Sequence, residues 1–358
     1  MRAARVDRLP MSGPGDVSAL TALLNTGEIS ANGILAILGK TEGNGCVNDF
    51  TRGFATQSLK LGLSNFLTSE EIDRIAMVMS GGTEGGLSPH WLVFSVTDAL
   101  PNDIPALALA SVATRPLSPS EIGREAQVEL VCDAVRSGMN EAGITSAADV
   151  HFVQIKCPLL TSERCDEVEG DVATTDTLKS MGLSRGASAL GVAKALGEIE
   201  TVNMEQICAV GSLWSSRASA SAGIELMRCE IVVLGMSKDW GGPLSIEHTV
   251  MQDAIDATSV VGLLSNIAPD AELQSFGSRL VAVLAKAEAS PDGQIRGQRH
   301  TMLEDSDISS TRHARGFVGG LLAGLTGTTE LFVSGGAEHQ GPPGGGPVAI
   351  IFKREPET

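Results

Sequence analysis

Three short polar signatures each occur three times along the chain, always in the same order. A lysine closes an apolar run at Lys40, Lys156 and Lys286. An Arg-Gly pair follows at Arg52, Arg185 and Arg315. A serine with small residues after it, and then a glutamate, completes each set at Ser80, Ser221 and Ser334. This triplication predicts one site built from three similar Lys-Arg-Ser sets.

These residue types point to acyl chemistry on a planar ligand. Serine is a poor nucleophile until a base takes its proton, and the six histidines show no triplicated placement. A lysine can act as that base if burial or nearby cations lower its pKa. The small residues after each serine let backbone N–H groups approach a developing oxyanion. A guanidinium donates two parallel hydrogen bonds, so three arginines suit a ring with carbonyls at threefold intervals.

Each element also has an ordinary interpretation. A single Ser-Gly is usually a turn, and a single arginine or lysine is usually solvated. Duplication of a structural scaffold would also repeat residues, but scaffold positions are normally apolar and the recurring ones here are polar. The shared site is therefore favoured. The residues alone do not say which set reacts, and Ser219 rivals Ser221, which is preferred because it keeps the glutamate at the shared spacing.

The elements around the signatures predict an α/β (α+β) fold whose sheets face a common centre. Each lysine ends a strand-like run, each Arg-Gly opens a helix rich in small residues, and a further strand follows each serine. Ser221 follows a polar stretch at 215–220, so no strand is predicted there. The long repeat period suits three domain-sized units, over 1–104, 112–250 and 256–358. A capping box at Ser118 and Glu121 predicts a helix to about residue 140.

Composition excludes several classes of partner. A formal net charge of −17 argues against DNA, RNA and anionic membrane surfaces. The six dispersed cysteines form no CxxC pair and no zinc-like spacing, which is typical of reduced thiols in a cytoplasmic protein. The sequence carries no signal-peptide pattern and no run of about 18 apolar residues. We expect a soluble, cytoplasmic protein.

The segment 337–346 is rich in glycine and proline and occurs once. It is either a surface loop or a cation site made of backbone carbonyls and an amide oxygen, ligands that Mg²⁺ and Ca²⁺ accept. The residues alone favour the loop.

Several long strings carry a specific resemblance that spans nearly the whole chain: MSGGTEGGLSPHW, MGLSRGASALG, SSRASASAGIELM, RGQRHTMLEDSDISSTRHARG and SGGAEHQGPPGGGPVAII. They resemble the cyanuric acid hydrolase (cyanuric acid amidohydrolase) and barbiturase family of ring-opening amidases. The resemblance implies three structurally similar units around a pseudo-threefold axis with one central active site. It also implies a homotetramer and no organic cofactor.

Residue roles follow from the resemblance at matching positions. It makes Ser221 the nucleophile and Lys156 its base, because the family places the working dyad in the middle unit. It implies that the substrate is held by Lys40, Arg52, Ser80, Gly81, Arg185, Ala222, Lys286, Arg315, Ser334 and Gly335. It implies a structural Mg²⁺ (or Ca²⁺), fixing the last Ser-Gly turn, at Glu288, Ala337, Gln340, Gly341, Pro342 and Gly345.

The activity that the resemblance implies is hydrolytic opening of cyanuric acid, a planar s-triazine trione. The product, carboxybiuret, decarboxylates to biuret during s-triazine degradation. Two alternatives stay open at this point. One is barbiturase activity on a pyrimidine trione that differs at one ring position. The other is a non-catalytic ring-binding protein on the same scaffold.

Overall fold

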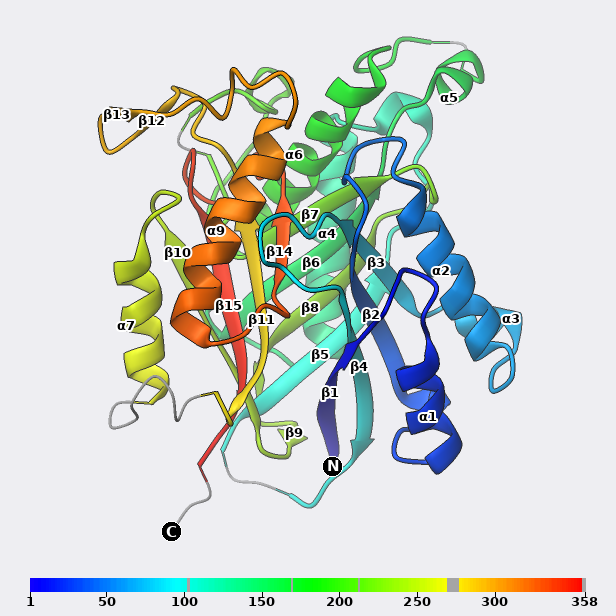
Figure 1. Cartoon of the computed structure of the whole chain (residues 1–358). Helices are drawn as coiled ribbons and strands as arrows, with labels where there is room; N and C mark the ends of the chain where they lie inside the picture. The colour runs from blue at the N-terminus through cyan, green and yellow to red at the C-terminus, as the bar shows by residue number, and fades with distance from the viewer. Residues whose placement is uncertain (102–103, 169, 212, 269–276, 356–358) are drawn as a thin grey trace.

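Three separate β-sheets organise the chain in the computed structural model, which describes residues 1–101, 104–168, 170–211, 213–268 and 277–355 (Figure 1). The first sheet has the order β3 (Ala76–Gly81), β2 (Ile34–Thr41), β4 (His90–Asp98), β1 (Arg2–Pro10), β9 (Trp240–Gly241). The second runs β5 (Ala106–Ala113), β8 (Glu230–Ser237), β6 (Val150–Pro158), β7 (Ala218–Gly223). The third runs β10 (Leu244–Met251), β15 (Gly346–Lys353), β11 (Leu280–Ala287), β14 (Phe332–Gly335). A small ribbon pairs β12 (Gln294–Ile295) with β13 (Gln298–Arg299).

The same pairing pattern recurs in all three sheets. Apart from β9, which pairs parallel with β1, the first and last strands of each sheet along the chain pair antiparallel. The last strand also pairs antiparallel with the lysine strand, and the lysine strand pairs parallel with the serine strand. A parallel pair needs a crossover, and a helix supplies it in each sheet. The crossover helices are α2 (Phe50–Leu63), α6 (Thr177–Ala195) and α9 (Ser310–Thr326). The mixed α/β architecture predicted from the sequence is confirmed.

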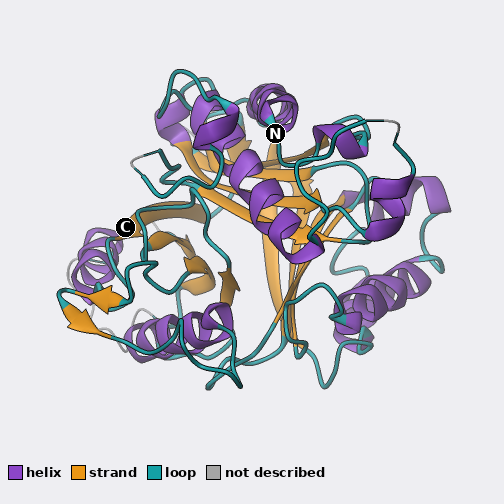
Figure 2. Cartoon of the chain, turned by 90° about the horizontal axis from the view of Figure 1, so that it is seen from above, coloured by secondary structure: helices purple, strands orange, loops and turns teal. Residues whose placement is uncertain are grey.

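Among the other described helices, α1 (Ser18–Thr26), α4 (Glu125–Glu141) and α7 (Ala257–Ile267) pack against the outside of the sheets (Figure 2). The short helices α3 (Ser69–Ile72) and α5 (Ser162–Asp166) lie in connections between strands. One hydrophobic core joins all three sheets through residues such as Leu38, Phe152 and Leu284. Separate clusters pack the first and third sheets against their own helices. The lysine strands β2, β6 and β11 are buried on both faces, which explains their near-continuous apolar runs.

Three local predictions were wrong. Residues Ala218–Gly223 form a fully buried strand at the edge of the second sheet, because small side chains fit the crowded place where it contacts β3 and β14. Arg52 lies in the first turn of its helix, but Arg185 and Arg315 do not open theirs. Asp49 and Asp176 cap α2 and α6 by accepting from backbone N–H groups, so Arg185 lies two turns inside its helix. The box at Ser118 and Glu121 opens a 3₁₀ turn, and α4 begins only at Glu125.

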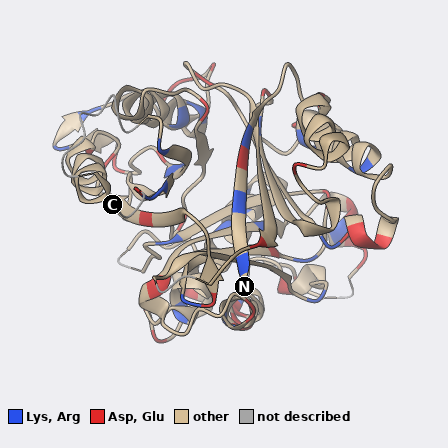
Figure 3. Ribbon diagram, turned by 90° about the horizontal axis from the view of Figure 1, so that it is seen from below, with Lys and Arg blue, Asp and Glu red and all other residues tan. Residues whose placement is uncertain are grey.

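Within the described residues, no helix is both long and apolar enough to cross a membrane. Figure 3 marks acidic and basic residues at interspersed positions along the ribbon.

Candidate active site

The three lysines and three serines meet in register. Each lysine lies directly opposite the serine of its own sheet in a parallel strand pair: Lys40 with Ser80, Lys156 with Ser221, Lys286 with Ser334. Opposed residues on neighbouring strands point to the same face. The serine strands β3, β7 and β14 contact one another pairwise. All six side chains are buried, with no residue more than 7% exposed. The structure therefore brings the three predicted sets to one centre.

A small polar cavity lies where these strands meet. Its lining contains nine of the predicted site residues, which are Arg52, Ser80, Gly81, Arg185, Ser221, Ala222, Arg315, Ser334 and Gly335. Its volume of about 20 Å³ holds a water molecule. It shares lining residues, including Arg185 and Arg315, with a neighbouring cavity of about 440 Å³. A ring-sized ligand would enter from that larger cavity and part the side chains at the centre.

The lysines link the sheets in a cycle. Each ammonium donates to the backbone carbonyl just before the serine of a different sheet: Lys40 to Val333, Lys156 to Met79 (3.3 Å) and Lys286 to Ala220 (3.0 Å). Going from lysine to acceptor, the order runs from first sheet to third, third to second and second to first. We call this arrangement the lysine cycle. Each lysine is therefore in register with the serine of its own set and hydrogen-bonded to the strand that carries the serine of another set.

Burial prepares the lysines for base chemistry. It lowers the pKa of Lys40 well below the usual value, with help from Arg315. It lowers the pKa of Lys286 to about 7, with help from Arg185. The pKa of Lys156 also falls through burial, although Glu225 opposes the change. A base works best when its pKa lies near the operating pH, so these environments favour general-base catalysis near neutrality.

The arginines also cross between sheets. Arg315 binds Glu84 through bonds of 2.7 and 2.9 Å, and Arg185 binds Glu338 through bonds of 2.6 and 2.8 Å. In both pairs the glutamate closes the serine signature of another sheet. Such bidentate pairs fix the plane of the guanidinium. Sequence analysis used these glutamates only as spacing markers, although their recurrence was the signal of this role.

Arg52 of the first set and Glu225 of the middle set depart from that pattern. Arg52 donates to the carbonyl of Ala222 (3.0 Å) and lies 3.8 Å from Asp49. Glu225, the remaining signature glutamate, instead forms an ion pair of 2.7 Å with Lys156. One set of the three therefore has a carboxylate on its lysine.

The serines are also distinguishable. Ser221 lines the central cavity, and its Oγ lies 3.1 Å from Ser334 Oγ. Ser219 is buried opposite Gln154, outside that lining, and its Oγ has no partner among the described residues. A direct Lys–Ser hydrogen bond within one set joins Lys286 Nζ to Ser334 Oγ at 3.3 Å.

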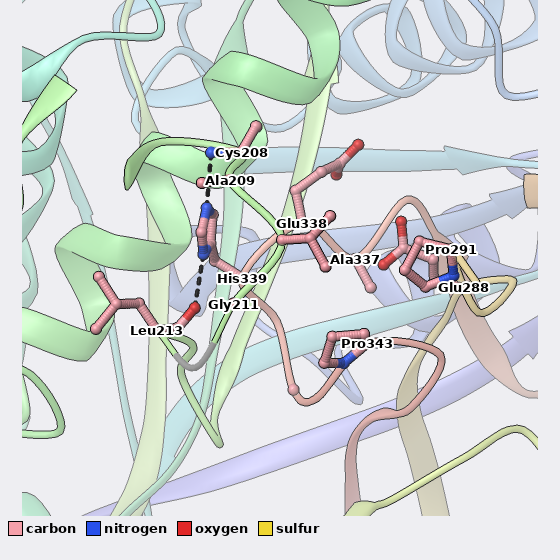
Figure 4. Close-up of a pocket in the computed structure, with 12 residues that line it drawn as sticks. Cys208, Ala209, Gly211, Leu213, Glu288, Pro291, Ala337, Glu338, His339 and Pro343 are labelled. Atoms are coloured by element: carbon pink, nitrogen blue, oxygen red, sulfur yellow. Dashed lines mark hydrogen bonds between the residues drawn. The ribbon is translucent and has the colours of Figure 1, made fainter. Parts of the chain in front are cut away.

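Three of the six predicted metal residues, Glu288, Ala337 and Gly341, line a separate cavity of about 210 Å³ (Figure 4). Burial and the nearby Glu338 raise the pKa of Glu288 to about 7, while Arg185 and Lys286 oppose the change. The amide oxygen of Gln340 accepts a hydrogen bond from Ala220 N–H (2.7 Å).

Any cation here would rely on backbone carbonyls. The described residues contain no group of three or more His, Cys, Asp or Glu side chains placed to hold a metal. Gly341 has a φ of 95°, and a Cβ there would lie 2.7 Å from Gly346. Only glycine fits such a turn, which shapes the loop containing Pro342 and Gly345. Glu288 and backbone carbonyls of this loop would be oxygen donors of the kind that Mg²⁺ and Ca²⁺ accept.

Comparison with known proteins finds a family model and relatives that match nearly the whole chain. A family model described as amidohydrolase ring-opening protein matches residues 5–353. A cyanuric acid amidohydrolase of Rhizobium johnstonii is 57% identical over 357 residues, 98% of each chain. That of Azorhizobium caulinodans is 57% identical over 99% of each chain. A crystal structure of cyanuric acid hydrolase from A. caulinodans superposes with a TM-score of 0.91, at 55% identity, covering 99% of this chain and 100% of that one. A second solved cyanuric acid hydrolase gives a TM-score of 0.94 at 48% identity, with the same coverage. The resemblance stated from the sequence is confirmed, and the chain belongs to the family of ring-opening amidohydrolases.

Proposed function

We propose that this protein is a cyanuric acid amidohydrolase that opens the s-triazine trione ring by hydrolysis. The observation that carries the proposal is the meeting of three serines and three arginines at one cavity, with a buried lysine in register with each serine. A ring with three carbonyls at threefold intervals matches three such sets in number and in hydrogen-bond character. The relatives at 57% identity carry this activity in their names.

We propose further that the three sheets are repeat units around a pseudo-threefold axis. Their shared strand order and the lysine cycle support this arrangement. The units predicted from the sequence span 1–104, 112–250 and 256–358. Strands β5 and β10 begin the second and third sheets, so units drawn from the sheets would begin at Ala106 and Leu244.

The proposed reaction uses Ser221 and Lys156. Lys156 takes the proton of Ser221 Oγ as the oxygen attacks a ring carbonyl, and the same proton then goes to the departing ring nitrogen. Water cleaves the resulting carbamoyl ester and frees carboxybiuret, which decarboxylates to biuret. Backbone N–H groups near Ala222 would hold the oxyanion. The other two serines, Lys40, Lys286, the arginines, Gly81 and Gly335 would bind the remaining carbonyls.

A rival dyad calls for a direct test. Lys286 touches Ser334, and its pKa of about 7 suits a base. We prefer Lys156 with Ser221 because only this lysine has a carboxylate partner among the described contacts of the three, and a base that gains a proton needs charge compensation. Single alanine substitutions of the three serines separate the two assignments.

Turnover of cyanuric acid by the purified protein tests the function, with barbituric acid assayed beside it. We expect biuret and CO₂ from cyanuric acid at a rate well above that of barbituric acid opening. Faster opening of barbituric acid would make the protein a barbiturase. Tight binding of cyanuric acid with no product after long incubation would make it a ring-binding protein.

We also propose a structural Mg²⁺ (or Ca²⁺) held by Glu288 and by carbonyls of the loop from Ala337 to Gly345. It would hold the turn that carries Ser334 and take no part in the chemistry. The resemblance further suggests a cytoplasmic homotetramer without an organic cofactor. Light scattering of the purified chain tests the tetramer.

A further inference from the structure

A second cavity reaches Lys156 from outside the central site. It has a volume of about 90 Å³. Polar and charged residues form much of its lining: Thr56, Lys60, Asp73, Lys156, Glu225, Arg228 and Glu230. The rest of the lining is apolar: Ile72, Ile75, Met77 and Leu226. It shares no lining residue with the central cavity. We call it the rear cavity. Lys156 therefore lies in register with Ser221 and also lines this separate cavity, where it contacts Glu225.

Glu225 connects that space to the lysine. Its carboxylate lies 2.7 Å from Lys156 Nζ, and its side chain is 22% exposed, against 1% for the lysine. A Cβ at position 223 would lie 2.0 Å from this carboxylate, so Gly223 leaves the room that the carboxylate occupies. The hydroxyl of Thr56 also lines the rear cavity, and it is buried with no partner among the described residues. A buried hydroxyl without a protein partner marks a place for water.

Other charges face this pair from the surrounding elements. Arg52 on α2 lowers the pKa of Lys156. Glu230 lies opposite the lysine on β8, but its carboxylate is taken by Arg228 and by Met77 N–H. Arg164 binds the carbonyl of Ile224 and lies near Glu225. Glu225 is thus the carboxylate in direct contact with the lysine.

The reaction leaves a proton to remove, if the proposed function holds. Water attacks the carbamoyl carbon of the Ser221 ester, the C–Oγ bond breaks, and Oγ regains one proton. The product at neutral pH is a carbamate anion, so the second proton of that water remains on the base. This proton must leave Lys156 before the lysine can act as a base again, while the product still occupies the central cavity.

We propose that Glu225 is a positioning residue that holds Lys156 toward Ser221 and passes its surplus proton to solvent through the rear cavity. The carboxylate stabilises the ammonium as it forms and accepts its proton, and water beside Thr56 takes the proton onward. The other two signature glutamates orient arginines, so the second copy has acquired a separate task.

The test compares Glu225→Gln with the matched control Glu84→Gln in cyanuric acid turnover. Glu225→Gln removes a charge-assisted hydrogen bond, so kcat falls about 10- to 100-fold while KM changes less than about twofold. Losing the carboxylate lowers the pKa of Lys156 further, so the acid limb of the pH profile moves to lower pH. Glu84→Gln loosens Arg315, so it raises KM and leaves the acid limb in place.

Chemical rescue adds a readout that loss of structure does not give. Formate fits the space freed in Glu225→Ala, and we expect activity to rise with its concentration in this variant but not in Glu84→Ala. A wild-type kcat and acid limb in Glu225→Gln, or a folded Glu225→Ala that ignores formate, overturns the proposal. Failure of the wild type to open cyanuric acid would instead refute the proposed function.

Discussion

Replacing each of the three serines by alanine in turn gives the most direct test of the site. The three positions are matched, because each serine is buried and lies in register with a lysine. Each substitution removes one oxygen and no bulk from a strand. Differences between Ser80→Ala, Ser221→Ala and Ser334→Ala therefore report on chemistry more than on packing.

The expected sizes differ by orders of magnitude. A serine that only binds a ring carbonyl contributes about 0.5–1.5 kcal/mol, so its loss lowers kcat/KM about 2- to 12-fold. Loss of a nucleophile is far larger, on the order of 10⁴-fold or more in kcat. Ser334→Ala has an added cost, because Lys286 and Ser221 both lose a hydrogen-bond partner, at 3.3 and 3.1 Å. We expect it to lower stability by about 1–3 kcal/mol.

Initial rates of biuret formation, with thermal melting of each variant, measure both effects. We expect Ser221→Ala to be inactive and well folded, and the other two variants to stay within about 100-fold of the wild type. Near-normal turnover by Ser221→Ala, together with an inactive but folded Ser334→Ala, would assign the nucleophile to the third sheet. That result would refute the reasoning from the carboxylate partner of Lys156.

Three other measurements test separate parts of the molecule. Burial lowers the pKa of His151 to about 4 and of His248 to about 3, and their Nδ1 atoms lie 3.0 Å apart. Histidines of the unfolded chain bind protons near pH 6.5, so the contribution of this pair to stability is full above that pH and falls towards pH 4. At pH 5 we expect the free energy of unfolding to be lower by about 2 kcal/mol per histidine. A free energy of unfolding that stays flat between pH 7 and pH 5 would contradict this. Mg²⁺ at a hundred times its Kd should add about 2.7 kcal/mol of stability, which is measured as a higher Tm. We expect Glu288→Gln to abolish this response. An equal rise of Tm in the wild type and in Glu288→Gln would exclude this carboxylate as a ligand. Arg315→Lys cannot reproduce the bidentate contact, so we expect KM to rise about tenfold or more with little change in kcat, and an unchanged KM would remove Arg315 from substrate binding.

The sequence predicted the residues of the site better than the contacts among them. The repeated order of the signatures assigned Lys156 and Ser221 to one set, but their strand register was not predicted, because no strand was predicted at Ser221. The sequence did not predict that Glu225 pairs with a lysine while Glu84 and Glu338 pair with arginines. Whether Glu225 meets Lys156 or Arg52 depends on how two sheets approach each other, and no local propensity encodes that distance.

Local errors had physical causes. The sequence does not predict a strand at Ser221, because the stretch before it is polar, yet every residue of Ala218–Gly223 is buried at the centre of the molecule. The glycine after Arg185 suggests a helix start at that arginine. Asp176 caps the helix two turns earlier, and capping oxygens decide where helices begin.

The lysine cycle makes the site depend on all three sheets. Each of the three lysines donates a hydrogen bond to a carbonyl of another sheet. If any one sheet opens, one lysine loses its anchor and one serine loses its neighbour, so no partly folded chain retains a complete site. Activity and native structure should then disappear together as denaturant is added, and a partial enzyme should not accumulate. Turnover should therefore report that all three sheets are assembled.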